Sequence, residues 1–311
     1  MNELRIRPAA RGDLERVARL LDEYDVADAG RADFGVAVLR DDWDRGGFDP
    51  ARDAWVAEEA GRLVGYAEVF EEDPGALDAY ARVHPDARGR GLGAALVAHT
   101  ERRAAQTASE RGAGLPLRNC ISATDDAARA LLHAHGYTLV RSFLHMEIAL
   151  PAPRVAAPVD PSVTIRPLDP VADEAAANAL LGEAFAGQWG FEETPPDAWS
   201  HPIAHADPGL VAMVDGGVAG VLLGRSWNDV GWVQDVGVAA AARRRGVGLA
   251  LMLEAFEHFA RRGLDRAMLN VDEDNPTGAP RLYERVGMQV RRRWDVLEKR
   301  IGRRAGGDDL V

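Results

Sequence analysis

Two short stretches, RGRGLG at residues 88–93 and RRRGVG at residues 243–248, carry most of the structural information in this chain of 311 residues. Each stretch follows a strand-like apolar run and precedes an amphipathic run with helical periodicity. A glycine-rich turn at the start of a helix leaves backbone N–H groups unused, with the positive end of the helix dipole behind them. Such a turn binds phosphate groups, and glycine lets the phosphates approach the backbone closely.

The two stretches belong to a longer internal repeat. Three pairs of matching motifs have nearly the same separation: Arg7 and Arg166 are 159 residues apart, Arg88 and Arg243 are 155 apart, and Gly136 and Gly287 are 151 apart. Offsets that drift so little over the whole length indicate two copies of one domain. The proline-rich stretch 151–161 predicts an extended linker between them. We therefore expect an N-terminal domain over residues 1–150 and a C-terminal domain over residues 162–311.

Each copy has the same order of expected elements. A short strand leads into one or two amphipathic helices, and a hairpin follows, with its turn at residues 60–61 in the first copy and 216–217 in the second. The next strand, residues 77–83 or 231–238, ends at the glycine loop, and a long helix begins there. A further strand, a helix and terminal strands complete the copy. This order predicts an α+β fold of two tandem domains, each with a mixed, mostly antiparallel sheet flanked by helices.

Composition excludes several classes of protein. Lys and Arg number 37 against 49 Asp and Glu, for a net charge of −12, so we expect no nucleic-acid partner. The first residues carry charges and lack the apolar run of a signal peptide, and no stretch of about 18 apolar residues predicts a membrane span. Cys120 is the single cysteine, which fits a reducing compartment. We expect a cytoplasmic protein without a metal, because the eight histidines show no metal-ligand spacing.

The loops also resemble a known family. VHPDARGRGLG (83–93) and VAAAARRRGVG (238–248) look like the acetyl-CoA loop of the GNAT superfamily of N-acetyltransferases, and NPTGAPRLYERVGM (275–288) looks like that family's closing strand–helix motif. The tandem arrangement is similar to that of mycothiol synthase-like two-domain proteins. The resemblance implies acetyl-CoA as co-substrate, with its pantetheine arm between two splayed parallel strands. It assigns coenzyme binding to Val236, Val238, Arg243, Arg244, Gly246, Val247, Gly248, Leu249 and Asn275, and in the first copy to Val83, Arg88, Arg90, Gly91, Leu92 and Gly93.

The two copies differ in the residue that would assist the leaving group. Tyr283 matches the family's tyrosine beside the coenzyme sulfur, where a phenol donates a proton to the departing thiolate. The same position in the first copy holds Leu132, which has no proton to give. His133 lies about 100 degrees further round the helix and is a poor substitute. We therefore expect the first domain to be catalytically degenerate and the second to be catalytic.

The general base is less clearly marked. The family often places a glutamate six residues before the position of Val238, and this chain has Trp232 there. Asp235, on the same strand, is our expected base, because an attacking amine must give up a proton to a carboxylate, directly or through water. Asp272 and Glu273, after the next strand, are the alternatives.

The stretch GQWGFEETPPDAW, residues 187–199, mixes aromatic side chains with carboxylates, which suits a cationic amine but is equally typical of a solvated acidic loop. We expect an acetyl-CoA-dependent N-acetyltransferase that acts on a primary amine of a small molecule, by direct attack in a ternary complex, as a monomer or homodimer. The alternatives are a non-catalytic acyl-CoA-binding or sensing protein and a protein N-terminal acetyltransferase.

Overall fold

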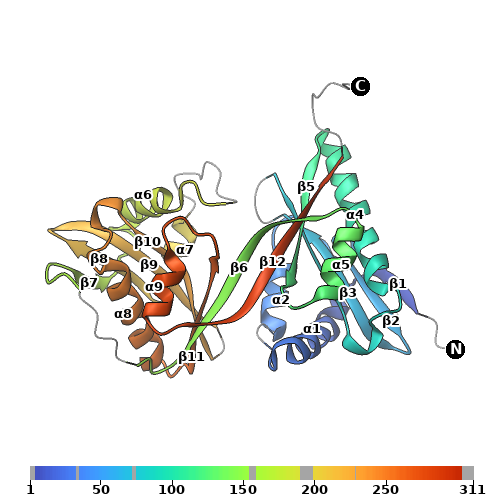
Figure 1. The fold of residues 1–311 in the computed structure, drawn as a ribbon, viewed down its shortest axis with the longest axis horizontal. Helices are drawn as coiled ribbons and strands as arrows, with labels where there is room; N and C mark the ends of the chain where they lie inside the picture. The colour runs from blue at the N-terminus through green and yellow to red at the C-terminus, as the bar shows by residue number, and fades with distance from the viewer. Residues whose placement is uncertain are drawn as a thin grey trace. The chain divides into compact units, whose positions relative to one another are not determined.

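The structure is a computed structural model that describes residues 4–32, 35–71, 75–153, 159–189, 199–227 and 229–302. The chain forms two compact units, residues 1–141 with 294–311 and residues 142–293. Each unit is a mostly antiparallel sheet flanked by helices, as Figure 1 shows, so the predicted α+β class is confirmed.

The first unit has one sheet with strands from both ends of the chain. Its strand order is β1 (Arg5–Pro8), β2 (Ala54–Glu59), β3 (Arg62–Phe70), β4 (Leu77–Val83), β5 (Leu115–Ser122) and β12 (Gln289–Ile301). Neighbouring strands run antiparallel, except that β4 and β5 are parallel. The helices are α1 (Leu14–Ala29), α2 (Gly35–Trp43), α3 (Pro50–Asp53), α4 (Leu92–Arg111) and α5 (Asp126–Ala134).

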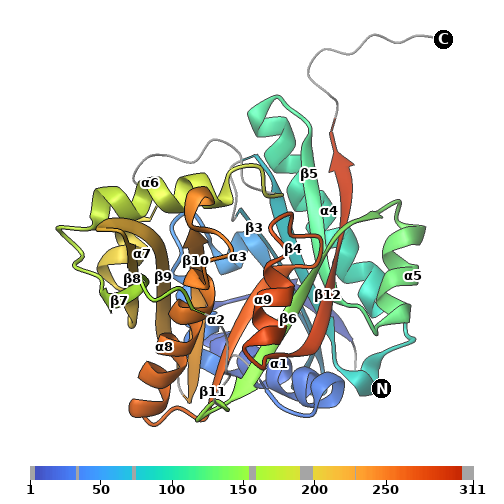
Figure 2. The ribbon, with the colours of Figure 1, turned by 60° about the vertical axis from the view of Figure 1, so that its left-hand side comes forward.

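The second unit repeats this architecture. Its strand order is β6 (Thr138–Ala149), β11 (Arg266–Asp272), β10 (Val230–Val238), β9 (Gly217–Trp227), β8 (Gly209–Val214) and β7 (Thr164–Pro167). The parallel pair is now β10 and β11. The helices are α6 (Glu174–Phe185), α7 (Ser200–Ala204), α8 (Val247–Arg261) and α9 (Ala279–Arg285), and Figure 2 shows α6 and α8 with the strands between them.

The final strands of the two copies are exchanged. Strand β6 comes from the first half of the chain, yet Met146 and Ile148 belong to the core of the second unit. Strand β12 comes from the second half, yet Leu297 and Ile301 belong to the core of the first. The unit boundaries therefore differ from the expected domains 1–150 and 162–311, because residues 142–150 and 294–302 each complete the other copy's sheet. Of the expected linker, residues 154–158 lie outside the described residues.

Local signals explain several matching features of the two copies. The first hairpin turns at Ala60-Gly61, with φ of 53° and 78°, as expected. The second turns at residues 215–216, one residue earlier than expected, because Asp215 takes the positive φ of 50°.

The repeated Arg-Pro motif places an arginine opposite a buried aspartate in both copies: Arg7 donates two hydrogen bonds to Asp13, and Arg166 donates two to Asp173.

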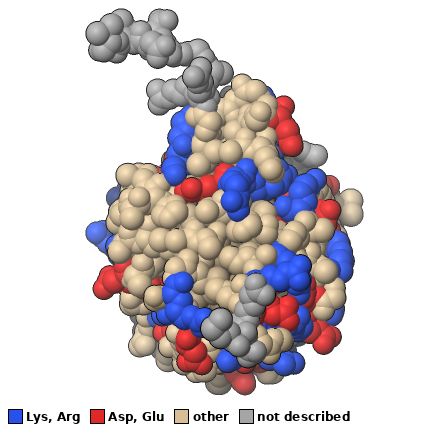
Figure 3. Space-filling model, turned by 90° about the vertical axis from the view of Figure 1, so that its right-hand side faces the viewer, with Lys and Arg blue, Asp and Glu red and all other residues tan. Residues whose placement is uncertain are grey.

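Much of the surface charge is paired. On the face drawn in Figure 3, basic and acidic side chains lie next to one another around a largely uncharged centre. In the first unit, for example, Arg90 forms an ion pair with Glu59 at 2.6 Å. Within the described residues, no helix combines the length and the apolar character needed to cross a bilayer.

Helices α6 and α8 cover opposite faces of β9 and β10. A Cβ atom added at Gly237 would meet Leu180 and Leu181 of α6 at 2.9 and 3.0 Å, whereas one added at Gly220 would meet Val247 of α8 at 2.7 Å. Gly220 is the register partner of Val238, the neighbour of Gly237. Because successive strand residues face opposite sides, Val236 and Val238 face α8, and Asp235 faces α6.

The packing of α8 on β10 is tight enough to predict the effect of one methyl group. A Cβ atom at Gly231 would lie 2.3 Å from the ring of Phe259, which is fully buried. We expect Gly231→Ala to lower the free energy of unfolding by about 1–3 kcal/mol through overpacking. Gly217→Ala is the matched control, because the nearest atom to its Cβ would be 3.7 Å away, and we expect a change within about 0.5 kcal/mol. Urea unfolding followed by circular dichroism measures both, and equal stabilities of the two variants would contradict this packing.

Candidate active site

The central feature of the second unit is the place where its two parallel strands separate. Strands β10 and β11 are neighbours over only three residue pairs, from Val230–Arg266 to Trp232–Met268. Strand β10 then continues to Val238 in register with β9 alone, after an irregularity between Val233 and Asp235. The edge of β10 that faced β11 thus opens onto a cavity of about 720 Å³. The register confirms the splayed pair that the resemblance implied.

The predicted phosphate loop forms one wall of this cavity. Gly246, with φ of 83°, is the N-cap of α8, and the first bond of the helix is donated by Ala250 N–H to Gly246 O at 2.9 Å. The preceding N–H groups of the first turn are not used by the helix, as at any helix start. The residues of the loop that line the cavity are Arg243, Arg244, Gly246, Val247, Gly248 and Leu249. All six are residues that the sequence assigned to coenzyme binding.

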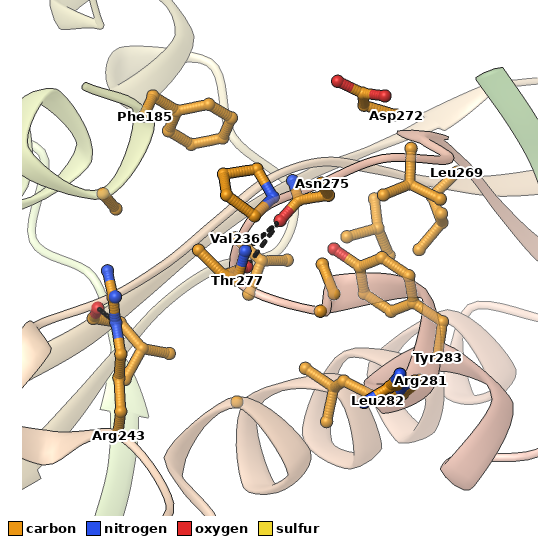
Figure 4. Close-up of a pocket in the computed structure, with 18 of the residues that line it drawn as sticks. Phe185, Val236, Arg243, Leu269, Asp272, Asn275, Thr277, Arg281, Leu282 and Tyr283 are labelled. Atoms are coloured by element: carbon orange, nitrogen blue, oxygen red, sulfur yellow. Dashed lines mark hydrogen bonds between the residues drawn. The ribbon is translucent and has the colours of Figure 1, made fainter. Parts of the chain in front are cut away.

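The three arginines of the loop have different roles. Arg243 and Arg244 are exposed and line the cavity, and Figure 4 shows Arg243 beside its open space. Arg245 instead binds Asp160, at 2.8 Å, and Asp215, at 3.1 Å. Arg243 Nε donates a long hydrogen bond to Val238 O at 3.4 Å, which leaves its Nη atoms and Arg244 for an anion, and Arg245 holds the loop to the body of the unit.

Tyr283 extends from α9 into the same cavity. Its hydroxyl group points into the open space in Figure 4, and the side chain is only 8% exposed. Burial raises the pKa of Tyr283 to about 12, and the negative charge of Asp235 adds to the shift. The phenol is therefore protonated at neutral pH and able to donate a proton.

Asp235 lies on the other face of β10, outside the lining of the cavity. The indole of Trp199 donates a hydrogen bond to its carboxylate, while Oδ2 is buried and has no hydrogen-bond partner among the described residues. Burial raises the pKa of Asp235 to about 6, although the bond from Trp199 and the charge of Arg225 act in the opposite direction. A carboxylate with this pKa changes protonation state close to neutral pH, as a general base requires.

The alternative carboxylates have other contacts. Glu273 forms an ion pair with Arg293 at 2.9 Å. Asp272 lines the cavity, but its Oδ1 accepts a hydrogen bond from the N–H of Asp274 in the turn after β11. Asn275 forms a turn before α9: its Oδ1 accepts bonds from the N–H and hydroxyl of Thr277, as Figure 4 shows, and α9 begins at Ala279.

Aromatic side chains lie around the cavity. The rings of Phe143 and Trp189 meet edge to face at 6.1 Å, and the rings of Phe185 and Trp199 lie 5.9 Å apart. Phe143 could not be found from the sequence pattern of the second copy, because it belongs to the exchanged strand β6. The other expected acceptor residues of this region, Phe191, Glu192, Glu193 and Asp197, lie outside the described residues.

The first unit has the same framework with other side chains. Strands β4 and β5 are in parallel register only from Leu77–Leu117 to Ala79–Asn119, and a cavity of about 340 Å³ follows. Gly91 is the N-cap of α4, with φ of 80°. This cavity is lined by the expected residues Val83, Arg88, Gly91, Leu92 and Gly93, but not by Arg90, which is bound to Glu59.

The residue that corresponds to Tyr283 is Leu132, as expected. The N–H of Tyr137 donates to Leu132 O at 3.0 Å, and the N–H of Met288 donates to Tyr283 O at the same distance, so the two positions are structurally equivalent. Leu132 lines the cavity of the first unit and is 3% exposed. His133 is exposed and does not line that cavity. Among the described residues of both units, no group of three or more potential metal ligands occurs.

Comparison with known proteins agrees with this geometry. The model of the "Acetyltransferase (GNAT) family" matches residues 176–288, and that of the "Acetyltransferase (GNAT) domain" matches residues 50–139. A mycothiol acetyltransferase of Streptomyces griseus is 33% identical over 293 residues, which cover 88% of this chain and 87% of that protein. A protein of the same name from Thermobispora bispora is 34% identical over 259 residues, 76% of this chain and 80% of its own.

Solved structures show the same fold. A GCN5-related N-acetyltransferase from Sphaerobacter thermophilus has a TM-score of 0.84 and 32% identity, covering 98% of this chain and 97% of its own. A tandem GNAT protein from the clavulanic acid biosynthesis pathway has a TM-score of 0.65 at 22% identity, covering 99% and 100%. With two such domains in one chain and relatives that match most of its length, the chain belongs to the GNAT family of acetyltransferases.

Proposed function

We propose that the second unit transfers the acetyl group of acetyl-CoA to a primary amine of a small molecule, by direct attack while both substrates are bound. One observation carries this proposal. The open edge of β10 has the phosphate loop and Tyr283 on one face and the buried carboxylate of Asp235 on the other. A donor for a leaving group and an acceptor for a proton thus lie on opposite faces of strand β10, with the donor in the cavity and the acceptor behind the strand.

The residues present suit acetyl-CoA. The unused N–H groups at the start of α8 and the guanidinium groups of Arg243 and Arg244 would hold the diphosphate. The backbone at Val236 and Val238, which β11 leaves unpaired, would hold the amide groups of the pantetheine arm. Bound there, acetyl-CoA supplies an activated thioester, so transfer to an amine needs no covalent enzyme intermediate.

Three groups of this chain would assist the transfer. The Asp235 carboxylate accepts the proton that the attacking amine must lose, directly or through water. Backbone N–H groups near Val238 stabilise the negative charge that develops on the carbonyl oxygen. The Tyr283 hydroxyl donates its proton to the departing sulfur. The whole arrangement lies in one unit, which supports a catalytic second unit and a degenerate first unit.

The acceptor is the least defined part of the proposal. Aromatic rings around the cavity, including Trp189 and Phe185, suit a cationic amine through cation–π contact. The relatives are named for mycothiol, a small molecule, which favours a small acceptor over a protein N-terminus. A panel of primary amines, assayed by release of free CoA thiol, tests this. Tight CoA binding without thiol release from any amine would favour the alternative of a sensing protein.

We expect Tyr283→Phe to lower kcat by about a hundredfold, because general acid assistance to the sulfur contributes about 10²–10⁴. KM for acetyl-CoA should change little, since the ring that lines the cavity is retained. Leu132→Met at the equivalent position of the first unit is the matched control and should leave kcat unchanged. Thiol-release kinetics on both variants measures this, and the opposite pattern would reverse the roles of the units.

We expect the pH profile of kcat/KM to rise with a midpoint near pH 6, because only the ionised Asp235 accepts a proton. Asp235→Asn should remove this acidic limb and lower the rate by about 10²–10⁴. An unchanged profile would exclude Asp235 as the base.

A stability measurement separates the loss of activity expected for Asp235→Asn from a loss caused by misfolding. Because the pKa of Asp235 is raised by burial, the folded chain holds its proton more tightly than the unfolded chain, and stability falls as pH rises from about 4 to about 6. Asp235→Asn removes this loss, so the variant should melt at or above the wild-type temperature at pH 8.

A further inference from the structure

The first unit carries a buried cation where the second unit has no side chain. Arg82 precedes Val83 at the end of β4, as Gly237 precedes Val238 at the end of β10. Tyr80, two residues earlier, stands at the position of Asp235. The first unit therefore lacks the expected base and has a guanidinium group beside the opening between its splayed strands.

The guanidinium group of Arg82 is incompletely satisfied. The side chain is 3% exposed, and its Nη atoms donate to Cys120 O at 3.3 and 3.4 Å, which are long hydrogen bonds. One Nη atom also donates to Ala81 O at 2.9 Å, but Nε is buried and no described residue accepts a hydrogen bond from it. Within the described part of the chain, no ion pair joins Arg82 to a carboxylate, although the negative charge of Asp25 contributes to raising its pKa.

Aromatic rings surround the same group. The guanidinium carbon lies 3.7 Å from the centre of the Tyr80 ring, 5.0 Å from that of Tyr24 and 5.6 Å from that of Trp294. Cation–π contacts offset part of the cost of burying a charge. A buried cation is stabilised further when an anion pairs with it. Since Arg82 lines the 340 Å³ cavity, that cavity is where an anion would reach it.

The other end of the cavity is suited to a second anionic group. The first bond of α4 is donated by Ala95 N–H to Gly91 O at 3.1 Å, so the earlier N–H groups of the helix are unused. Gly91, Leu92 and Gly93 line the cavity together with Arg88, whose Nη2 lies 3.7 Å from the carboxylate of Asp125, another lining residue. A ligand that fits both ends has a diphosphate at one end and a negative charge at the other. The charge of Arg82 disfavours an ammonium group next to it.

We propose that the first unit binds, without turning it over, a CoA thioester whose acyl group ends in a carboxylate, and that this carboxylate pairs with Arg82. The inference rests on the same assignment of glycine loops to the CoA diphosphate as the proposed function. It assigns the two units different acyl groups: a dicarboxylic acyl group in the first and acetyl in the second.

The test uses the full chain with Gly248→Leu, which closes the second unit's loop, because a Cβ at Gly248 already approaches Leu282 to 2.9 Å. Calorimetric titration with succinyl-CoA should then show one site, at least about thirtyfold tighter than acetyl-CoA, the lower range for losing a buried charge pair. Adding Arg82→Met should abolish this preference, whereas Arg82→Lys, which keeps the charge, should retain part of it. Melting temperatures confirm that each variant is folded.

Equal binding of the two esters, or a preference that survives Arg82→Met, would overturn the proposal and leave Arg82 a structural residue. Free succinate that binds as tightly as succinyl-CoA would also overturn it, because the site would then recognise a carboxylic acid rather than a thioester. If the Gly248→Leu chain binds no CoA ester, the inference fails, while Tyr283-dependent turnover in the wild-type chain would still uphold the proposed function.

Discussion

The separation of two parallel strands is the constraint on which the rest of the structure depends. A parallel pair in the middle of a sheet normally uses all its backbone hydrogen-bonding groups, and unpaired buried groups are costly. In the second unit β10 and β11 share only three residue pairs, and the irregularity at Gln234 marks where they diverge. The edge of β10 thereby retains unpaired backbone groups next to a helix N-terminus. Backbone geometry, rather than any single side chain, thus creates the opening that we propose as the coenzyme site.

This framework is built twice, but its side chains give the two copies different chemistry. Tyr283 faces the opening of the second unit, and Leu132 occupies the same place in the first. A carboxylate, Asp235, lies beside the second opening, whereas a guanidinium group, Arg82, lies beside the first. The loop and the splayed strands are therefore common to both units. The units differ in the few side chains around the opening, and these side chains determine the chemistry available to each unit.

Sequence alone was informative where the signal is local. The glycine loops require particular backbone conformations, such as the positive φ of Gly246, and both lie at the helix starts where the motifs predicted them. The four-residue spacing from Tyr283 to Gly287 was enough to find Leu132, because both lie at the same place relative to a helix end. The α+β class followed from the order of strands and helices.

The rest depends on contacts between distant residues. Periodicity tells which face of a strand is buried but not which strand is its neighbour, so the exchange of β6 and β12 was not predicted. The environment of Asp235 was missed for the same reason: its pKa depends on burial and on Trp199, which lies far away in sequence. The partly unsatisfied environment of Arg82 involves Trp294 from the exchanged strand β12 and could not be found from its neighbours along the chain.

The most direct test of the central claim is to count CoA sites by calorimetry in the wild-type chain and in Gly248→Leu, with Gly182→Ala as control, since a Cβ at Gly182 meets no atom within 4 Å. If the open edge of β10 and the loop before α8 form the coenzyme site, wild type and control bind CoA alike, and Gly248→Leu loses one site together with acetyl transfer. Unchanged stoichiometry and affinity in Gly248→Leu, or no heat of CoA binding in the wild-type chain, would contradict this account.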